Sequence, residues 1–167
     1  MKPVLYVCNV DENSVLNGND YVNKILEVTK NEGAEVLVIA TAIEAEIADL
    51  ESIDEQLLFL EEMGLDQPGV NKLIQSTYKL LNLQTYFTAG EKEVRAWTIV
   101  NGTKAPQAAA VIHTDFEKGF IRAEVISYDN FIKFGSEQIC RENGKLSVEG
   151  KDYVVNDGDI MHFRFNV

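Results

Sequence analysis

Two short segments of this chain are apolar at almost every position, and this pattern restricts the possible folds more than any other feature. Four of the five residues in segment 4–8 (VLYVC) are aliphatic or sulfur-bearing, and segment 35–40 (EVLVIA) is apolar after its first residue. A β-strand is apolar on both faces where both faces are covered, as in a parallel sheet. The intervening segment predicts a loop and then a helix capped at Asn19 or Asp20 and ended near Gly33. Strand, helix and strand predict one right-handed crossover between parallel strands.

This crossover cannot be a complete sheet. Two parallel strands that are apolar on both faces need further strands beside them and helices over both sides. The sequence contains no further strand of this kind. We therefore expect residues 1–83 to hold the last third of an α/β domain whose beginning is absent.

Three further helices are expected before residue 84. The segment AIEAEIADLESIDEQLLFLEEMGL is helical with a break near Ser52, which can cap the second helix with Glu55 at capping-box spacing. The apolar side of that helix is predicted to be Leu57, Leu58 and Leu60. A turn at Pro68-Gly69 precedes the third helix, whose periodic apolar stripe indicates packing. The stripe consists of Leu73, Ile74, Thr77, Leu80 and Leu81.

From Gln84 the pattern changes to short strands and turns. A strand runs into a turn at Asn101-Gly102, a helix follows over TKAPQAAAVIHTDFEKG with Pro106 in its first turn, and FIRAEVISY predicts another strand. The last strand alternates, so one face is core and the other is wet. Its core residues are Met161, Phe163, Phe165 and Val167, and its wet residues are His162, Arg164 and Asn166. Residues 84–167 therefore suit a small β-grasp domain, which makes the whole chain α/β followed by α+β.

Charge divides the chain in the same place. Of the net charge of −12, residues 1–83 carry 15 acids and 5 bases (−10), and residues 84–167 carry 12 acids and 10 bases (−2). Residues 41–66 include nine acids and no Lys or Arg, a pattern typical of solvated helix faces. This balance argues against an intrinsic nucleic-acid binder, and we expect no DNA partner.

The remaining composition favours the cytoplasm. No apolar run approaches the ~20 residues of a membrane helix, so no membrane partner is expected, and no signal peptide is visible. Cys8 and Cys140 are far apart and form no CxxC motif. Because Cys8 falls in a core-like strand, we interpret it as a buried free thiol.

Asn9, Val10 and Glu12 directly follow the first strand and form an Asn-x-x-acid motif. Guanine-specific P-loop proteins carry Asn-Lys-x-Asp, in which the Asp accepts two hydrogen bonds from guanine and the Lys stem packs over the base. Val10 and the longer Glu12 do not suit that pairing, whereas the Asn9 oxygen can accept from the adenine amino group. The motif therefore predicts an adenine-tolerant base site. The alternative is a strand-end turn in which Asn9 caps its own backbone.

Thr41, Ala42 and Ile43 follow the second strand and open a helix. Their backbone N–H groups could contact the same base, while Glu44 and Glu46 favour the helix dipole. A capped helix start explains these residue types equally well. His113 is interpreted as a hydrogen-bonded structural residue at a helix end, and two histidines with two scattered cysteines give no metal-site spacing.

Five segments closely resemble the C-terminal portion of the Obg-related YchF / Obg-like ATPase family. They are KPVLYVCNVDE, TAIEAEIADL, LLNLQTYFTAGEKEVRAWTI, APQAAAVIHTDFEKGFIRAEVI and GKDYVVNDGDIMHFRFNV, and the similarity runs across essentially all 167 residues. The resemblance implies the C-terminal part of a P-loop NTPase (Obg-type G) domain with trailing helices in residues 1–83. For residues 84–167 it implies a TGS domain, a ubiquitin-like β-grasp module also found in threonyl-tRNA synthetases and stringent-response synthetases.

Members of that family are P-loop hydrolases that bind ATP in preference to GTP and associate with ribosomes. On this resemblance, Asn9, Val10 and Glu12 match the base-recognition motif, and Thr41-Ala42 matches the last nucleotide motif. The resemblance further implies ATP with Mg²⁺ as the ligand of the complete protein. It also implies contact with the ribosome or ribosomal RNA, which we assign to residues 84–167.

The chain departs from the family in one large respect. The family's phosphate-binding loop, switch regions and coiled-coil insertion all precede the stretch present here, and no G-x-x-x-x-G-K-[ST] occurs in it. We therefore expect no catalytic residue, no metal ligand and no tightly bound nucleotide in this chain alone. The leading hypothesis is the C-terminal part of a ribosome-associated, ATP-preferring NTPase. The alternative is a stand-alone, non-enzymatic TGS module that binds RNA or protein.

Overall fold

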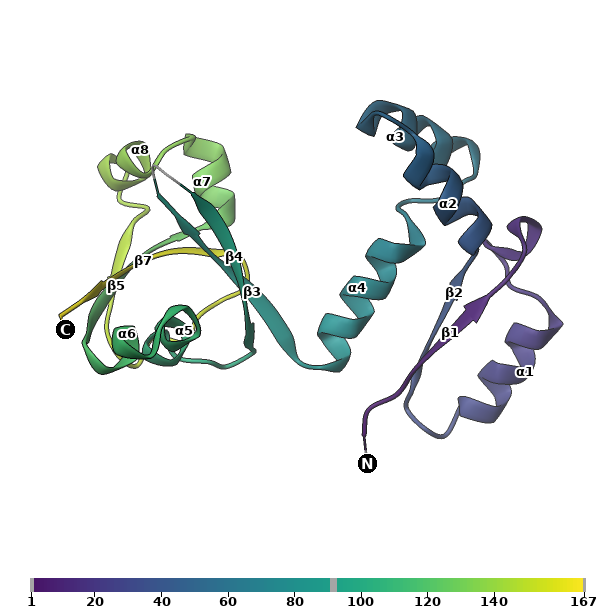
Figure 1. Ribbon diagram of the computed structural model, residues 1–167, viewed down its shortest axis with the longest axis horizontal. Helices are drawn as coiled ribbons and strands as arrows, with labels where there is room; N and C mark the ends of the chain where they lie inside the picture. The colour runs from purple at the N-terminus through teal and green to yellow at the C-terminus, as the bar shows by residue number, and fades with distance from the viewer. Residues whose placement is uncertain (1, 91–92, 167) are drawn as a thin grey trace. The chain divides into compact units, whose positions relative to one another are not determined.

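The chain divides into two compact units, Met1–Leu81 (unit 1) and Asn82–Val167 (unit 2). The computed structural model in Figure 1 describes residues 2–90 and 93–166. The division lies two residues before the boundary expected between residues 83 and 84. Asn82 has a φ of 54°, a left-handed conformation that Asn tolerates, and it turns the chain out of a helix and into the first strand of unit 2.

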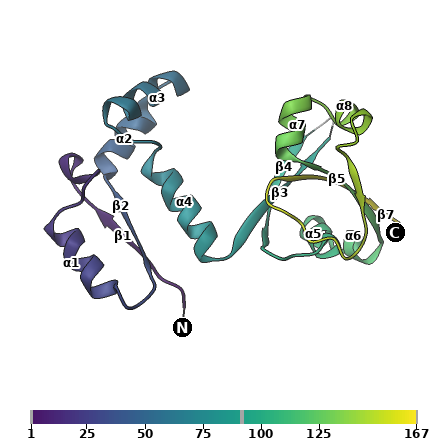
Figure 2. The same ribbon diagram turned by 180° about the vertical axis from the view of Figure 1, so that it is seen from behind.

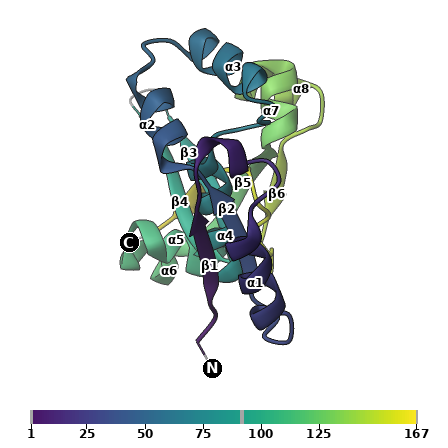
Figure 3. The same ribbon diagram turned by 90° about the vertical axis from the view of Figure 1, so that its right-hand side faces the viewer.

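Unit 1 contains the predicted pair of parallel strands. β1 (Leu5–Asn9) pairs with β2 (Glu35–Ile39) from Leu5 opposite Glu35 to Asn9 opposite Ile39. The two strands run side by side in Figure 3. Between them lies α1 (Asp20–Thr29), whose first N–H groups donate to the side chain of Asn19 as predicted. These two strands form the whole sheet of unit 1 within the residues that the structure describes.

The strands of unit 1 are less buried than their sequence predicts. All five residues of β2 are only half-buried, and Val7 of β1 is 43% exposed. Cys8 is a free thiol, but it is half-buried, so the expectation of full burial is wrong. The physical reason is that a two-stranded sheet leaves an open edge on each strand, and α1 and α4 (Gly69–Leu80) cover only part of its faces (Figure 1).

α2 (Thr41–Asp49), α3 (Ile53–Glu62) and α4 complete unit 1. Ser52 and Glu55 form the predicted capping box at the start of α3. A small core consists of Ala40, Ile43, Ile47 and Leu60.

Part of the predicted packing in these helices is wrong. Leu57 and Leu58 are 57% and 66% exposed, because α3 meets the small core only through its Leu60 side. Ile74 and Leu81 of the α4 stripe are also about half exposed, since α4 lies on two strands and not on a full sheet.

Unit 2 holds a five-stranded mixed sheet in the order β4-β3-β7-β5-β6. Its first strand β3 and last strand β7 are neighbours and parallel, whereas β3–β4, β5–β7 and β5–β6 are antiparallel. α5 and α6 lie on one side of the sheet and α7 and α8 on the other (Figure 2). The elements are β3 (Leu83–Ala89), β4 (Val94–Val100), α5 (Ala105–Ile112), α6 (Thr114–Lys118), β5 (Phe120–Ser127), α7 (Tyr128–Phe134), α8 (Glu137–Glu142), β6 (Ser147–Glu149) and β7 (Asp159–Phe165).

The core of unit 2 lies between the sheet and α5. The Tyr86 hydroxyl donates to the Ala108 carbonyl of α5 at 2.9 Å, and burial raises the pKa of that phenol. The alternation predicted for the last strand is confirmed, because Met161 and Phe163 are buried while His162 is exposed. Val167, which was expected on the same apolar face, lies outside the described residues. The buried cluster comprises Tyr86, Ile99, Ala105, Ala108, Ala109, Phe120, Ala123, Val125, Val155, Met161 and Phe163.

Two features of unit 2 differ from the expectation. The single helix predicted over residues 103–119 is broken at His113, which ends α5 and whose ring Nδ1 accepts from the Asp115 N–H at the start of α6. The structural role predicted for His113 is thus confirmed. Tyr128, expected at the end of the preceding strand, opens α7 instead, and residues 129–149, for which no element was predicted, complete α7 and form α8 and β6. Among the described residues, no helix combines the length and apolar character needed to cross a bilayer.

Candidate functional site

Asn9 links the carboxyl ends of the two parallel strands. Its side-chain oxygen accepts a hydrogen bond from the Thr41 N–H at 3.0 Å, although the two residues are 32 positions apart. The N-cap residue of α2 is Ala40, which has no side-chain acceptor, so the first turn of the helix takes its cap from Asn9 instead. Figure 1 shows the place, where β2 passes into α2.

The alternative in which Asn9 caps its own local turn is wrong. That turn is capped by Asp11, whose carboxylate accepts from both the N–H and the hydroxyl of Ser14 at 3.0 Å. The Asn9 oxygen, which was expected to accept from an adenine amino group, already accepts a hydrogen bond from the Thr41 N–H. Its Nδ2 group donates to no other group among the described residues, so the exposed end of the Asn9 amide is a hydrogen-bond donor.

Val10 extends the strand pairing through its backbone and packs on the core through its side chain. Its N–H donates to the Ile39 carbonyl at 2.9 Å, and its half-buried side chain packs on the small core of unit 1. The Val10 N–H is therefore engaged within the protein. The backbone group that remains at this position is the carbonyl, which is an acceptor.

Glu12 opens a short 3-10 turn, Glu12–Ser14, and is exposed. Within the described residues its carboxylate forms no hydrogen bond or ion pair with another group. The Asp11 cap fixes the turn that carries it. Glu12 is thus a positioned acceptor without an internal partner at the same end of β1 as Asn9.

The first turn of α2 holds one buried side chain, Ile43, and backbone N–H groups that have no acceptor within the helix. The Ile43 side chain is 1% exposed in the small core, so its expected contact with a base is restricted to its backbone. The N–H groups of Ala42 and Ile43 belong to the first turn, where a helix offers no internal acceptor. The Thr41 N–H, in contrast, donates to the Asn9 side-chain oxygen.

Glu44 has a role that the sequence reasoning missed. Its carboxylate accepts from the Gly69 N–H at 2.6 Å and the Val70 N–H at 3.0 Å, and so caps α4 across 25 residues. Pro68 stands at the N-cap of α4 and offers no side-chain acceptor, which is the signal that could have indicated a remote cap. Glu44 therefore links the first turn of α2, which belongs to the candidate site, to the start of α4.

Other candidate chemistry is absent from the described part of the chain. No group of three or more His, Cys, Asp or Glu residues there is placed to hold a metal ion. His113 caps α6, and His162 lies on the exposed side of β7. The polar groups that the structure brings together at one sheet end are those of Asn9, Glu12 and the start of α2.

Comparison with known proteins identifies the relatives of the chain. The family model YchF-GTPase_C, described as "Protein of unknown function (DUF933)", matches residues 83–166. The "Ribosome-binding ATPase YchF" of Haemophilus ducreyi is 58% identical over 167 residues, which cover 100% of this chain and 46% of that protein. The protein of the same name from Bacillus subtilis is 53% identical over 168 residues, 99% of this chain and 46% of that protein.

Solved structures agree in fold. The YchF GTPase of Schizosaccharomyces pombe superposes with a TM-score of 0.84 at 38% identity, over 97% of this chain and 43% of that one. A GTP-binding protein from Pyrococcus horikoshii, at 17% identity and a TM-score of 0.67, shares the fold. The chain thus spans about half the length of the curated relatives it matches. It belongs to the YchF family and corresponds to the C-terminal part of the family's proteins.

Proposed function

We propose that unit 1 carries the base-reading end of an ATP-preferring P-loop NTPase site, and that unit 2 is its TGS interaction domain. The observation that carries this proposal is the Asn9–Thr41 hydrogen bond. It joins the ends of two parallel strands into one edge, which is where ligands bind in open α/β sheets. The names of the curated relatives, ribosome-binding ATPases, support the same assignment.

The polar groups at this edge suit adenine. Adenine offers a ring-nitrogen acceptor at N7 beside an amino donor at N6. The Asn9 amide can donate to the ring nitrogen, and the Val10 carbonyl or the Glu12 carboxylate can accept from the amino group. Guanine carries a carbonyl oxygen at the position of the adenine amino group, so these acceptors would face another acceptor. We infer a preference for ATP over GTP.

The triphosphate and Mg²⁺ belong to residues outside this chain. The helices that follow this edge, within residues 41–66, carry nine acids and no Lys or Arg, so they supply no cation for phosphate. The chain contains no phosphate-binding loop, and hydrolysis depends on that loop and its metal ligand. We therefore expect this chain alone neither to hydrolyse ATP nor to bind it tightly. Calorimetry with Mg-ATP tests this, and a micromolar dissociation constant would contradict it.

Base choice is tested in the full-length protein by exchanging the motif. Val10→Lys with Glu12→Asp restores the guanine-reading pattern, and guanine should gain over adenine by roughly 1–3 kcal/mol, the value of one buried polar pair. Because Val10 also packs on the small core, Glu12→Asp alone is measured beside the double variant. An unchanged ratio of ATP to GTP affinity in both variants would overturn the assignment, and Glu46→Asp, exposed on α2, is the matched control.

The two roles of Asn9 can be separated. Asn9→Asp keeps an acceptor for the Thr41 N–H, so unit 1 should stay folded, but it replaces the amide donor with a negative charge. We expect nucleotide affinity of the full-length protein to fall at least tenfold with little change in thermal stability. Equal affinity for ATP in this variant would show that the Asn9 amide does not contact the base.

Unit 2 fits the TGS assignment and the contact with ribosomes. Its parallel first and last strands, with α5 crossing one face of the sheet, support a β-grasp module. Residues 84–167 are nearly neutral, so they repel ribosomal RNA far less than residues 1–83 do. The separate core of unit 2 also favours the second candidate, a TGS module that binds RNA or protein without nucleotide chemistry. Co-sedimentation of the full-length protein with ribosomes, with and without ATP, distinguishes the two.

A further inference from the structure

Two carboxylates hold α4 on unit 1, one near each end of the helix. At its start, the Glu44 carboxylate accepts from the Gly69 N–H at 2.6 Å and the Val70 N–H at 3.0 Å. Towards its end, the hydroxyl of the buried Ser76 donates to the Glu35 carboxylate of β2 at 2.8 Å. Among the described residues, none of α4 belongs to the small core of unit 1 or packs against it. The helix can therefore leave the strands without opening that core.

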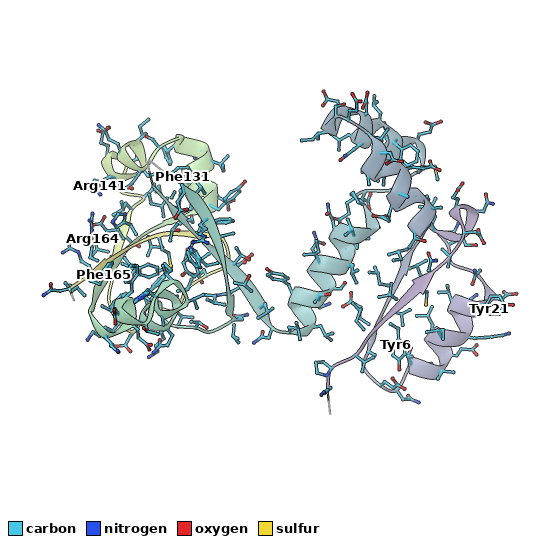
Figure 4. All side chains as sticks on the ribbon, in the orientation of Figure 1. Tyr6, Tyr21, Phe131, Arg141, Arg164 and Phe165 are labelled. Carbon is cyan, nitrogen blue, oxygen red and sulfur yellow. The ribbon has the colours of Figure 1, made fainter. Side chains whose placement is uncertain are left out.

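Gly69 permits a close approach between α4 and the candidate site. A Cβ atom added at Gly69 would lie 2.8 Å from the Glu44 Oε1 and 3.0 Å from the Ile39 Cγ2. Both neighbours belong to the site, because Ile39 lies opposite Asn9 in the strand pair and Glu44 stands in the first turn of α2. A side chain at position 69 would displace the carboxylate or move α4 away. Figure 4 shows the strand pair between α4 and α1, which carries the labelled Tyr21.

Three anchors fix the first turn of α2. The Thr41 N–H donates to Asn9, and the Ile43 side chain is buried in the small core. The third anchor is the bond from the Glu44 side chain to α4, and it exists only while α4 is docked. The Ala42 and Ile43 N–H groups, which the proposed function directs at the base, are therefore held in place in part by α4.

We propose that Glu44 and Gly69 are positioning residues that couple nucleotide binding at the base edge to the docking of α4. A base on the first turn of α2 favours the conformation in which Glu44 holds α4, and an undocked α4 releases that turn and weakens binding. Linkage makes the two effects equal in free energy. The inference rests on the proposed base-reading role of this edge and adds its regulation. Because α4 is the last helix before β3, a bound base acts on the segment that leads into unit 2.

The test compares two ligands of the full-length protein, Mg-ATP and Mg-tripolyphosphate, by calorimetry. Inorganic tripolyphosphate has the phosphate chain of ATP but no base, so its binding does not use the first turn of α2. Glu44→Gln keeps the length of the side chain but removes the charge and one of the two acceptor oxygens. It should weaken ATP binding at least about fivefold, the lower end of typical couplings, and leave tripolyphosphate binding unchanged. A variant that merely unfolds unit 1 would lose both ligands.

Gly69→Ala tests the same coupling from the side of α4. Helix propensity favours alanine over glycine at this helical position, so a loss of ATP affinity must come from the added methyl group. Its effect should not add to that of Glu44→Gln, because both variants break one contact. Two matched controls should leave both affinities unchanged. They are Glu46→Gln, at an exposed position of α2, and Gly150→Ala, where an added Cβ would meet nothing within 4 Å.

Hydrogen exchange on the full-length protein measures the coupling in the reverse direction. Saturating ATP should slow the amides of residues 69–73 at the start of α4 by at least about fivefold, whereas tripolyphosphate should not. In Glu44→Gln this protection by ATP should shrink. The coupling is overturned if ATP leaves these amides unchanged, or if Glu44→Gln weakens ATP and tripolyphosphate equally.

Asn9→Asp separates this inference from the proposed function. If Asn9→Asp weakens ATP binding and Glu44→Gln does not, the base edge stands and the coupling is wrong. If Glu44→Gln weakens the binding of ATP but not of tripolyphosphate, while Asn9→Asp has no effect, the coupling stands and the proposed contact of Asn9 with the base is wrong.

Discussion

Unit 1 and unit 2 use similar apolar strands with different results. In unit 1, β2 is apolar from Val36 to Ile39, yet every residue of the strand is only half-buried. In unit 2, β7 is apolar at alternate positions, and both Met161 and Phe163 are almost completely buried. The difference lies in the neighbours, because β7 has a strand on each side and β2 has β1 alone.

An apolar run therefore specifies a strand but not its burial. Among the described residues, the core cluster of unit 2 has eleven buried members and that of unit 1 has four. Unit 1 also presents exposed leucines on α3 and open edges on both strands, which are surfaces that pair readily with other chains. We infer that unit 2 is the more stable of the two.

The largest expected effect comes from the core of unit 2. Phe163→Ala removes a ring that meets Tyr86 and Phe120 edge-on, and should lower the free energy of unfolding of unit 2 by about 3–5 kcal/mol. Urea unfolding followed by Trp97, the single tryptophan of the chain, reports on unit 2 alone. Ile132→Ala, at a 62% exposed site in unit 2, is the control and should change stability by less than about 0.5 kcal/mol. A loss below about 1 kcal/mol for Phe163→Ala would contradict the packing described.

A smaller effect is expected from the remote cap in unit 1. Glu44→Ala removes the carboxylate that accepts from Gly69 and Val70, and should destabilise unit 1 by roughly 1–3 kcal/mol. Hydrogen exchange of the α4 amides measures it. Glu46→Ala, at an exposed position of α2, is the matched control and should leave the exchange rates of the α4 amides unchanged. If both variants behave alike, Glu44 does not cap α4.

These contrasts mark what the sequence could predict. Local signals were sufficient for β1, β2, β4, β5 and β7, for the caps at Asn19 and Ser52, and for the alternation of β7, because each depends on residues within a few positions. They did not indicate β3 or β6. Remote contacts were not predictable in this way. The Asn9–Thr41 bond spans 32 residues and the Glu44 cap spans 25, and only the fold brings those groups together.

The rest of the fold and site shows the same limit. The motif indicated Asn9 and Glu12, but the packing role of Val10 and the direction of the Asn9 amide depend on the sheet. Short helices such as α8 are held by tertiary contacts and have too few residues for a clear apolar period. The three arginines around Glu124 come from β5, β7 and α8, so no sequence spacing indicates the cluster.

The smallest expected effect is the pH dependence contributed by Glu124. Burial acts to raise the pKa of this carboxyl, but the hydrogen bond and charge of Arg164, with the charges of Arg141 and His162, outweigh it and hold the pKa below its usual value of 4.5. Because the folded pKa is the lower one, the contribution is present above about pH 4.5 and is lost as the pH falls through the folded value.

Comparison with Glu124→Gln isolates that contribution. The stability difference between wild type and the variant should shrink from about pH 5 to about pH 3 in urea unfolding followed by Trp97. Asp159 acts with the opposite sign, since burial raises its pKa, but it is present in both proteins and cancels. A difference that stays constant over this range would show that Glu124 is not held ionised by the arginines.

Native-state hydrogen exchange on the whole chain tests the central claim most directly, that unit 2 closes its own core and unit 1 does not. We predict that the amides of residues 36–39 in β2 exchange at least about tenfold faster than those of residues 161–165 in β7, because β2 opens locally and β7 opens only with its unit. Exchange that is equal in the two strands, or slower in β2, would contradict the account and show that the two-stranded sheet is as stable as the five-stranded one.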